Sequence, residues 1–408
     1  MLIRLAWRNL WRQKRRTLLT AAALALALAL SLFMRSLQEG TYSNNIDNAA
    51  RFATGLVQIQ HPEYQESQGI DDLVPKSADF IAPARALPSV SHLLPRLESF
   101  ALAAGEQRSK GALVMAGVPS LENDYAKLGE KLVAGEFLED DDNQVLVGEG
   151  LAQFLELAIG DEIVLYGQGY RGQTAAGLYR IKGLLRFPVP GLDNQLVYLP
   201  LPLAQQLYST GDLISAWVLH THTLAQLSDT EQQLKALYPD QAVRDWQDLA
   251  PEMAQQILMD KAGGLFMMYL LYGVVGFGLF ATLLMMTLER QREFAVMLAT
   301  GMLRGRLLAL VMIESLFIAA LGVAMGLLLA TPVLLYLAHN PIQMTGDAAQ
   351  MMLELGWDPI LPALVDPGLF LDQIGIVLAL LALCLLYPLW RIHRLELVSA
   401  LKGGAHAR

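Results

Sequence analysis

Apolar residues are distributed unevenly along this chain of 408 residues. One long apolar run opens the chain, three close it, and a mixed stretch with the character of a soluble domain lies between them. A helix that crosses the hydrocarbon core of a membrane needs roughly 20 predominantly apolar residues. Four segments satisfy this requirement: residues 17–33, 263–288, 307–338 and 370–390. We therefore predict an α-helical membrane protein with four transmembrane helices, one before and three after a large inserted domain.

Basic residues predict how the chain is oriented, because segments on the cytoplasmic side of a membrane carry an excess of Lys and Arg. Three segments are rich in these residues and are predicted to be cytoplasmic: an entrance helix at 1–16, the segment at 289–306 and the tail at 391–408. The loop at 339–369 contains no Lys or Arg. We therefore expect this loop, and the domain at 37–262, on the outer side.

The first apolar run, taken with its flank as 17–36, is preceded by basic residues, as a signal peptide is. Arg35 closes the run, however, and no A-x-A cleavage site followed by a polar mature start is evident near its end. A retained membrane anchor is therefore the interpretation that we prefer.

The segment at 37–262 alternates runs of β character with helical patterns. The strand candidates are rich in β-branched and aromatic residues and are bounded by turn residues; they lie at 55–60, 112–116, 144–147, 162–166, 179–185, 195–199 and 216–220. Helical spacing of apolar residues occurs at 148–157, 202–208 and 224–237. Mixed runs of this kind predict an α+β domain. A stretch of about 225 residues suffices for a packed core and for two subdomains.

Charge separates the regions of the chain. The formal net charge of −9 comes from acids concentrated in 37–262, whereas the predicted cytoplasmic segments carry an excess of bases. An acidic outer domain argues against nucleic acid as a partner. The only cysteine, Cys384, lies inside the fourth predicted span, so the outer domain has no disulfide and its core must be held by packing.

Motifs that carry catalysis are absent from the sequence. It contains no G-x-x-x-x-G-K-[ST] loop for nucleotide phosphates, and neither H-E-x-x-H nor G-x-S-x-G occurs. We therefore assign no catalytic residue, no cofactor site and no metal site, and we expect a non-catalytic subunit.

Two other groups of residues carry weaker signals. His220 and His222 stand two apart on a predicted strand, which would direct both rings to one face, where they could ligate zinc. With no third ligand nearby in the sequence, ordinary surface histidines are the alternative. The four acids at 139–142 lack the alternating ligands and the glycine of a calcium loop, so we interpret them as a solvated loop.

Glu314 is a carboxylate inside the third predicted span, about two helical turns from its cytoplasmic end. Ionisable residues within a membrane are energetically unfavourable, and a functional role is their default interpretation. A structural hydrogen bond to a neighbouring helix near the interface is the alternative. The sequence does not separate the two.

The segment at 289–306 has the composition of a helix, with Glu293 near its start and Gly301 where a helix would end. Phe294 and Met297 follow helical spacing, so we predict a short amphipathic helix across the inner face of the membrane. A solvated connector is the alternative, although a loop that only connects two spans could be far shorter.

The same segment carries the pattern E-R-x-R-E-F-A-V-x-x-A-x-G, and the span after it contains Glu314 and a G-x-x-x-G motif at Gly322 and Gly326. This combination resembles the FtsX-like permease domain of ABC transporters of the macrolide-exporter type. The C-terminal YPLWRIHRLELVSALKGG is similar to the closing motif of the family, with Leu397 where proline is usual. The N-terminal LAWRNLWRQKRRTLLTA resembles its entrance helix.

The inserted domain resembles the periplasmic core domain of the same family at VLVGEGLAQFLELAIGDEIVL and at DNQLVYLPLPLAQQLYSTGD. Within the family, the strand IKGLLRF and the V-Y-L-P-L strand after it look most like those of lipoprotein-releasing permeases. Together these resemblances cover nearly the whole chain.

The resemblance implies a mechanism called mechanotransmission, in which a separate ATPase subunit binds ATP and Mg²⁺, dimerises and pushes the cytoplasmic helix. Glu289, Arg290, Glu293 and Gly301 match the coupling segment of the family and are the implied ATPase contacts. This chain itself would hold no cofactor.

The implied assembly is a pair of permeases in the bacterial inner membrane, either two identical copies or one copy and a paralogue, with the large domain in the periplasm. The implied substrate is a lipoprotein, a peptide or another amphiphile that is met outside or at the outer leaflet. The alternative is a membrane-anchored regulator that transmits ATP-driven motion to a periplasmic cell-wall enzyme.

One loop departs from the lipoprotein-releasing pattern. Members that recruit a carrier chaperone have an apolar, proline-containing hairpin before the IKGLL-like strand, whereas this chain has GQGYRGQTAAG at 167–177. We expect a flexible polar loop there. Such a loop loses ordering entropy on binding, which disfavours direct handoff to a carrier through it.

Overall fold

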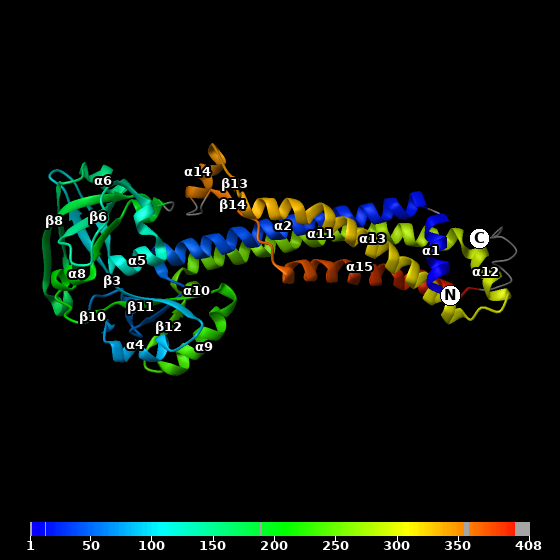
Figure 1. The fold of residues 1–408 in the computed structure, drawn as a ribbon, viewed down its shortest axis with the longest axis horizontal. Coiled ribbons are helices and arrows are strands. Elements are labelled where there is room, and N and C mark those ends of the chain that lie inside the picture. Colours follow the sequence, from blue (N-terminus) through cyan, green and yellow to red (C-terminus); the bar gives the residue numbers. More distant parts are fainter. Residues whose placement is uncertain (1, 13, 188–189, 355–358, 396–408) are drawn as a thin grey trace. The chain divides into compact units, whose positions relative to one another are not determined.

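Long helices form where the sequence predicts membrane spans. The structure is a computed structural model that describes residues 2–12, 14–187, 190–354 and 359–395 (Figure 1). Within these ranges, four helices are long and apolar enough to cross a membrane: α2 (Lys14–Ala49), α11 (Pro251–Glu289), α13 (Arg304–His339) and α15 (Pro367–His393). The prediction of four membrane helices, one before and three after an inserted domain, is confirmed.

Two of these helices continue well beyond the predicted spans. α2 runs to Ala49, although the sequence analysis ended the first span at residue 36, and α11 begins at Pro251 rather than at residue 263. The apolar runs are thus the central parts of longer helices, because a helix already started adds further residues at little cost. The limits of the membrane along each helix stay a prediction.

Shorter elements accompany the long helices: α1 (Leu2–Arg12), α12 (Gln291–Ala299), α14 (Asp347–Glu354) and the paired strands β13 (Ile342–Gln343) and β14 (Ile360–Leu361). α1 is amphipathic, since Ala6 and Leu10 are buried whereas Trp7 and Trp11 are half exposed. Tryptophan is enriched where a helix meets the membrane–water interface, which suits the exposed face of this helix.

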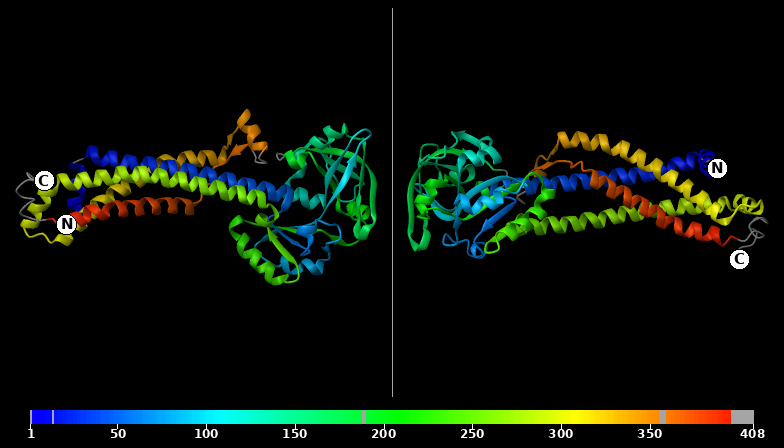
Figure 2. Two further views of the ribbon diagram at one scale, coloured as in Figure 1. Left: turned by 180° about the vertical axis from the view of Figure 1, so that it is seen from behind. Right: turned by 60° about the horizontal axis from the view of Figure 1, so that its bottom comes forward.

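The chain divides into two compact units. The first, the membrane unit, comprises Met1–Tyr42, Leu258–Ile342 and Ile360–Arg408, and the second, the α+β unit, comprises Ser43–Ile257 and Gln343–Pro359. Figure 2 shows the long helices of the membrane unit running side by side.

Two glycines of α13 lie at its contact with α2. A Cβ atom at Gly322 would lie 2.8 Å from Leu24 Cβ, and one at Gly326 would lie 3.0 Å from the carbonyl oxygen of Ala25. Both distances are shorter than van der Waals contact, so only glycine lets the two helices approach this closely. The G-x-x-x-G motif therefore forms the α2–α13 interface, as small residues do between membrane helices.

A buried polar contact joins three of the long helices. The hydroxyl of Tyr272 on α11 lies 2.8 Å from Ser31 Oγ on α2 and 2.8 Å from Gln373 Oε1 on α15. Polar groups within a membrane need such partners because no water is present to replace them. The sequence analysis did not single out these residues, since an isolated polar residue in an apolar run has no distinctive pattern.

Replacing Gly322 with leucine should force α2 and α13 apart. We expect Gly322→Leu to lower the midpoint of thermal unfolding of the detergent-solubilised chain, since overpacking destabilises by about 1–3 kcal/mol. Gly375→Leu on α15 is the matched control, because a Cβ at Gly375 would have open space around it. Equal midpoints for the two variants would contradict the interface.

The α+β unit is built on a sheet of 10 strands in the order β12-β1-β11-β3-β4-β9-β6-β8-β5, with β7 pairing β3 and β8. Its strands are β1 (Val57–Gln60), β3 (Val90–Ala104), β4 (Ser109–Gly117), β5 (Leu132–Gly135), β6 (Gln144–Gly148), β7 (Glu162–Gln168), β8 (Thr174–Leu185), β9 (Leu196–Pro200), β11 (Ala216–Thr221) and β12 (Ala242–Asp245). A separate pair is formed by β2 (Val74–Pro75) and β10 (Leu213–Ile214).

β3 connects the two halves of the sheet. Its first part pairs with β11 up to Arg96, and its second part pairs with β4 from Leu97 to Ala104. In the second half, β7 pairs with both β8 and β3, so β3, β4, β9, β6, β8 and β7 close into a ring. Small and branched side chains fill the face of these strands that is turned inward: Ala103, Val114, Val147, Leu165 and Val197.

Helices cover both halves of the sheet (Figure 1). They are α3 (Tyr64–Ser67), α4 (Ala78–Arg85), α5 (Pro119–Ala126), α6 (Glu149–Leu155), α7 (Pro190–Asp193), α8 (Leu201–Tyr208), α9 (Leu227–Leu237) and α10 (Trp246–Leu249), with a π-helix η1 (Ala50–Thr54) directly after α2 and 3₁₀ turns η2 (Leu128–Lys131), η3 (Tyr170–Gly172) and η4 (Leu224–Gln226). α9 and α10 contact β12, whereas α6 and α8 contact β8. The prediction of an α+β domain is confirmed.

The prediction of a flexible loop over the whole of 167–177 is wrong. β7 and β8 stay paired as far as Gln168 and Thr174, so only residues 169–173 form the turn. The alanines and glycines of this stretch have low β propensity. The sequence analysis therefore ended the strand at 162–166 too early and began the strand at 179–185 too late. The acidic run at 139–142 is largely exposed, as a solvated loop is, and Asp142 also accepts a hydrogen bond of 2.7 Å from Lys182 Nζ.

A buried ion pair anchors β3. The side chains of Arg96 and Glu122 are each 1 % exposed, and the guanidinium donates to both carboxylate oxygens at 2.6 and 2.8 Å. Arg96 also donates to the carbonyl of Ala53 in η1. Burial alone would lower the pKa of Arg96, but the charge of Glu122 outweighs it and raises the pKa above its ordinary value. The pair therefore holds η1 and α5 against the sheet.

Removing one partner of this pair should destabilise the α+β unit strongly. We expect Arg96→Met to lower the free energy of unfolding by about 3–5 kcal/mol, because Glu122 would be left buried and unpaired. The double variant Arg96→Met/Glu122→Leu should recover most of that loss. Pulse proteolysis of the full chain in urea measures the free energy of unfolding of each variant. A loss in the double variant equal to the sum of the losses from the two single substitutions would argue against a tight pair.

Candidate functional site

The segment between α11 and α13 forms the short helix that the sequence predicts. α12 begins after Arg290 and ends at Ala299. Its end is a Schellman motif, in which Met302 N donates to Met297 O at 3.0 Å. Gly301 has a φ of 95° at this point, a conformation that glycine adopts without steric cost. Gly301 therefore turns the chain from α12 toward α13.

Two ion pairs connect this segment to the N-terminal part of the chain. Glu293 on α12 pairs with Arg12 at the end of α1, and Glu289 at the end of α11 pairs with Arg16 near the start of α2. All four side chains are partly exposed, so each pair contributes little to stability. Their effect is positional, because they hold α12 beside the junction of α1 and α2.

A third ion pair is buried. The side chains of Arg290 and Glu314 are only 8% and 6% exposed, and the guanidinium donates to both carboxylate oxygens, with Nη2 3.2 Å from Oε1. Asn9 Nδ2 on α1 donates to the same Oε1 at 2.8 Å. Glu314 therefore makes the interhelical hydrogen bonds that the sequence analysis considered as its structural alternative.

Apolar packing fixes the inner side of α12. A buried cluster draws residues from α1, α12, α13 and α15: Ala6, Phe294, Leu307, Leu310, Val311 and Ile392. The guanidinium carbon of Arg290 lies 5.1 Å from the centroid of the Phe294 ring, a favourable cation–π distance. A movement of α12 must therefore displace the helices packed against it.

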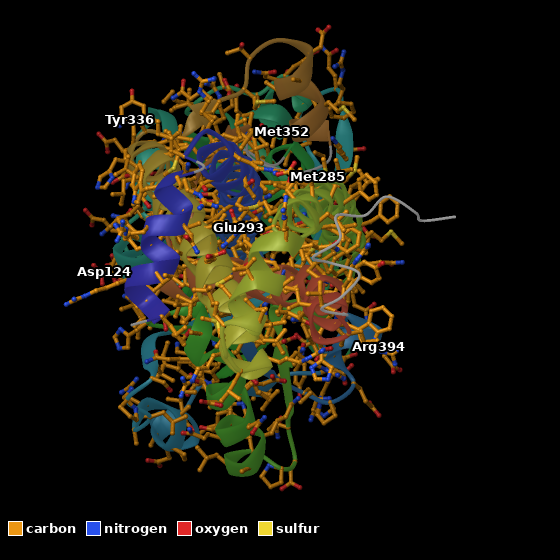
Figure 3. The ribbon with its side chains drawn as sticks, turned by 90° about the vertical axis from the view of Figure 1, so that its right-hand side faces the viewer. Asp124, Met285, Glu293, Tyr336, Met352 and Arg394 are labelled. Carbon is orange, nitrogen blue, oxygen red and sulfur yellow. The ribbon has the colours of Figure 1, made fainter. Side chains whose placement is uncertain are left out.

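The opposite side of α12 is exposed. Val296 is 48% exposed and Leu303, just after the helix, is 64% exposed, and Arg292, Glu293 and Gly301 are exposed beside them. We call these five residues the coupling surface. Figure 3 looks along the helices onto this end of the membrane unit and labels Glu293. Exposed apolar side chains rimmed by charges are typical of protein-binding surfaces.

The predicted coupling residues differ in their surroundings. Glu289, Glu293 and Gly301 are exposed, whereas Arg290 is buried against Glu314. Burial alone would raise the pKa of Glu293, but hydrogen bonds from Arg12 and Arg290 outweigh it and hold the pKa below its ordinary value. Glu293 is therefore ionised at neutral pH.

Val296 and Leu303 were missed by the sequence analysis, which looked for charged contacts. The helical period was the available signal, because Val296 lies away from the face that carries the buried Phe294.

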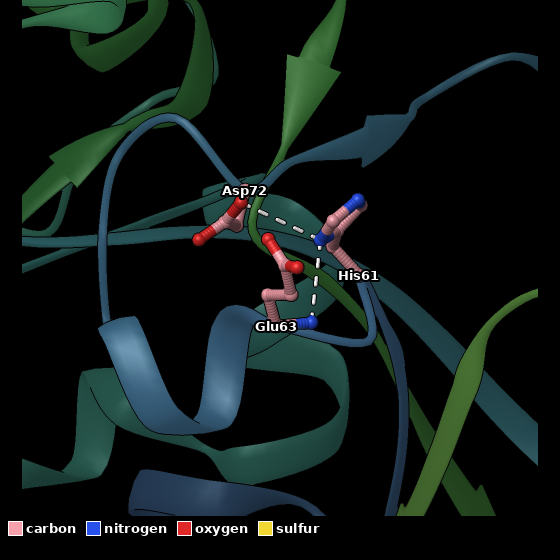
Figure 4. Close-up of side chains that lie close together, drawn as sticks. All are labelled: His61, Glu63 and Asp72. Atoms are coloured by element: carbon pink, nitrogen blue, oxygen red, sulfur yellow. Dashed lines mark hydrogen bonds and ion pairs between the residues drawn. The ribbon is translucent and has the colours of Figure 1, made fainter.

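One group of side chains among the described residues has the spacing of metal ligands (Figure 4). Candidate ligand atoms of His61, Glu63 and Asp72 lie within 4.8 Å of one another. His61 Nδ1 already accepts a hydrogen bond of 3.3 Å from the backbone N–H of Glu63, and Asp72 accepts one from the hydroxyl of Ser67. These bonds explain the conformation of the loop without an ion, so we assign no metal to it.

The two histidines noted in the sequence do not share a face. β11 ends at Thr221, where its register against β3 shifts, and His222 beyond it is exposed. His220 is fully buried, with its ring stacked on Tyr125 at a centroid distance of 3.7 Å. The interpretation as surface histidines is therefore wrong for His220.

Family comparisons match both parts of the chain. The FtsX-like permease C-terminal family matches residues 265–397, and the MacB-like periplasmic core domain family matches residues 17–237. With four membrane helices around an α+β insertion, these matches define a multi-pass permease component of an ABC transporter. The chain belongs to the FtsX-like permeases that carry a MacB-like periplasmic core domain. Leu397 and the rest of the closing motif after residue 395 lie outside the described residues.

Named relatives are distant. The lipoprotein-releasing system transmembrane protein LolC of Xylella fastidiosa is 23% identical over 336 residues, which cover 79% of this chain and 80% of the relative. The protein of the same name from Neisseria meningitidis is 24% identical over 246 residues, which cover 57% and 58%.

Solved structures show weaker similarity. The periplasmic region of MacB from Actinobacillus actinomycetemcomitans is 14% identical with a TM-score of 0.35, covering 52% of this chain and 97% of that one. The extracellular domain of the transporter YknZ from Gram-positive bacteria is 14% identical with a TM-score of 0.33, covering 46% and 98%. At these scores the likeness carries no further argument.

Replacing Arg290 with methionine should destabilise the membrane unit. We expect a loss of about 3–5 kcal/mol, because Glu314 would remain buried without its cation. Arg292→Met, at an exposed position two residues away, is the matched control and should change stability by less than about 0.5 kcal/mol. Thermal unfolding of the solubilised chain compares them, and identical midpoints would show that the buried pair is dispensable.

Proposed function

We propose that this chain couples ATP hydrolysis by a separate ATPase subunit to a conformational change of its α+β unit, and that this change releases or exports a lipoprotein or another amphiphile. The observation that carries the proposal is the arrangement of α12. Its inner side packs against α1, α13 and α15, while the coupling surface is exposed. A push on this surface would therefore move helices rather than deform a loop.

The coupling surface is the proposed docking site of the ATPase. Val296 and Leu303 would supply apolar contact, and Glu293 would supply a fixed charge. ATP and Mg²⁺ would be bound by the partner, because this sequence contains no phosphate-binding loop of the G-x-x-x-x-G-K-[ST] type. Glu289 and Gly301 remain proposed contacts. Arg290 acts as a positioning residue, since its side chain is committed to Glu314.

α2 and α11 would carry the movement, because each is a continuous helix that contributes residues to both units. The pair between Arg16 and Glu289 ties the two helices together at the end near α12. Continuous backbone hydrogen bonding makes a helix a stiff element, so a displacement at one end is passed along its axis.

Substrate and location follow from the relatives and from the charges. The relatives are named as lipoprotein-releasing transmembrane proteins, which supports an amphiphilic substrate. The excess of basic residues at 1–16, 289–306 and 391–408 supports a cytoplasmic α12 and a periplasmic α+β unit. We propose an inner-membrane assembly of two permeases, identical or paralogous, with two ATPase subunits.

Reversing the charge of Glu293 should uncouple the ATPase. In Glu293→Arg the new cation would face Arg12, so we expect coupled hydrolysis by the assembled complex to fall by about tenfold, equivalent to 1.4 kcal/mol of binding. Glu252→Arg, at an exposed acid in the first turn of α11, is the control and should behave as the unmodified chain. Unchanged coupling in Glu293→Arg would overturn this docking site.

Purification of the tagged chain in mild detergent, followed by mass spectrometry of what accompanies it, tests the function as a whole. An ATPase together with a lipidated protein is the expected result. An ATPase together with a soluble cell-wall enzyme would instead indicate a membrane-anchored regulator. Recovery of the tagged chain without any ATPase would contradict both the release of an amphiphile and the regulation of a cell-wall enzyme.

A further inference from the structure

A cavity of about 220 Å³ lies on the outer face of the strand ring in the α+β unit. Its walls come from η1, β1, α3, β3, β4 and α10. Half of the lining residues are apolar or aromatic, among them Tyr64, Phe100, Leu113, Met115 and Leu249, and the others are polar, among them three glutamines and a single acid, Glu98. All of these residues belong to the α+β unit. The proposed coupling mechanism makes no use of them.

The register of β3 against β4 explains why an acid and apolar side chains meet here. Glu98 pairs with Met115 across the ladder, and Phe100 pairs with Leu113. Residues two apart on a strand point to the same face, so Glu98 and Phe100 are neighbours on it. Phe100 is 55% exposed, so much of its surface is accessible to a ligand.

The carboxylate of Glu98 is incompletely partnered. Its Oε1 is buried and has no hydrogen-bond partner among the described residues. Burial raises the pKa of this carboxyl, and the nearby charge of Arg96 opposes that rise without cancelling it. Arg96 itself is committed to Glu122. A buried carboxylate without a hydrogen-bonded cation is costly, and burial therefore favours its protonated form. A positive group bound at Oε1 would instead stabilise the ionised form of Glu98.

We propose that this cavity binds a small organic amine in its ammonium form, with an aromatic or short aliphatic body. The ammonium group pairs with Glu98 through charge-assisted hydrogen bonds. The body packs on Phe100, Leu113 and Met115, where burying apolar surface adds affinity. The cavity is smaller than the pockets of about 300–1,000 Å³ that hold drug-sized ligands, which restricts the ligand to a small amine.

Other ligand classes fit the cavity less well. An anion would be repelled by Glu98, and a neutral apolar compound would leave the carboxylate unpaired. A divalent cation such as Ca²⁺ takes six or more oxygen ligands and binds more tightly as more of them are charged, whereas Glu98 is the only acid among the residues that line the cavity. The amine is the class that satisfies both the charge and the apolar wall.

Fluorine NMR of the full chain in nanodiscs tests the proposal. The probe is 4-fluorophenethylamine, and 4-fluorophenethyl alcohol, which has the same ring without the charge, is the matched control ligand. Empty nanodiscs correct for partition into lipid. We expect saturable line broadening with the amine and affinity for the alcohol lower by about tenfold, the minimum expected for a hydrogen bond to a charged group.

Three variants locate the site. Glu98→Gln keeps the shape of the side chain and removes its charge, so it should reduce affinity for the amine by about tenfold. Asp240→Asn, at an exposed acid elsewhere in the unit, should leave binding unchanged. Phe100→Ala should weaken both probes, and the exposure of Phe100 makes this variant tolerable to the fold even if Glu98→Gln is not.

Three results would overturn the proposal: no saturable binding of the amine, equal affinity for amine and alcohol, or an affinity for the amine that is unchanged in Glu98→Gln or in Phe100→Ala. The proposed amine site is independent of the proposed ATP-driven function, because these measurements need no partner subunit. Failure to bind the amine would therefore leave the proposed coupling to an ATPase intact, and the reverse also holds.

Discussion

The buried ion pair between Arg290 and Glu314 is the constraint around which one end of the membrane unit is organised. An acid inside an apolar helix must be partnered, and Glu314 is reached by Arg290 from the junction of α11 and α12 and by Asn9 from α1. These contacts require the separate elements to meet at one point. The orientation of α12 follows, with Phe294 packed inward and Val296 exposed.

A second buried ion pair organises the α+β unit in a comparable way. Arg96 on β3 joins Glu122 on α5 and a carbonyl of η1, so elements distant in sequence meet at the strand that both halves of the sheet share. A buried pair is weak support for stability and is better regarded as a determinant of one particular arrangement. Glu98, two residues along the same strand, lies outside this pairing, which is why its carboxylate is available to a ligand.

The sequence predicted well those features that depend on neighbours along the chain. The four long helices follow from the length and hydropathy of the apolar runs, because a single apolar run in lipid satisfies all of its backbone hydrogen bonds internally as a helix. The end of α12 follows from Gly301, because a positive φ is a local requirement. β3 was not predicted, although it has 15 residues, because Pro95, Arg96 and Glu98 interrupt its alternation and their partners come from elsewhere in the fold.

By itself, the sequence determined the membrane helices, the charge bias from which their orientation is predicted, the short helix between α11 and α13, and seven of the strands, since each of these depends on residues close together in the chain. Only the tertiary structure decided that Arg290 faces inward while Glu293 faces out, that 167–177 is a paired hairpin, that His220 is buried and that Oε1 of Glu98 has no hydrogen-bond partner in the part of the chain that the structure describes. Each of these outcomes depends on which residues, distant in sequence, lie against the side chain or strand in question.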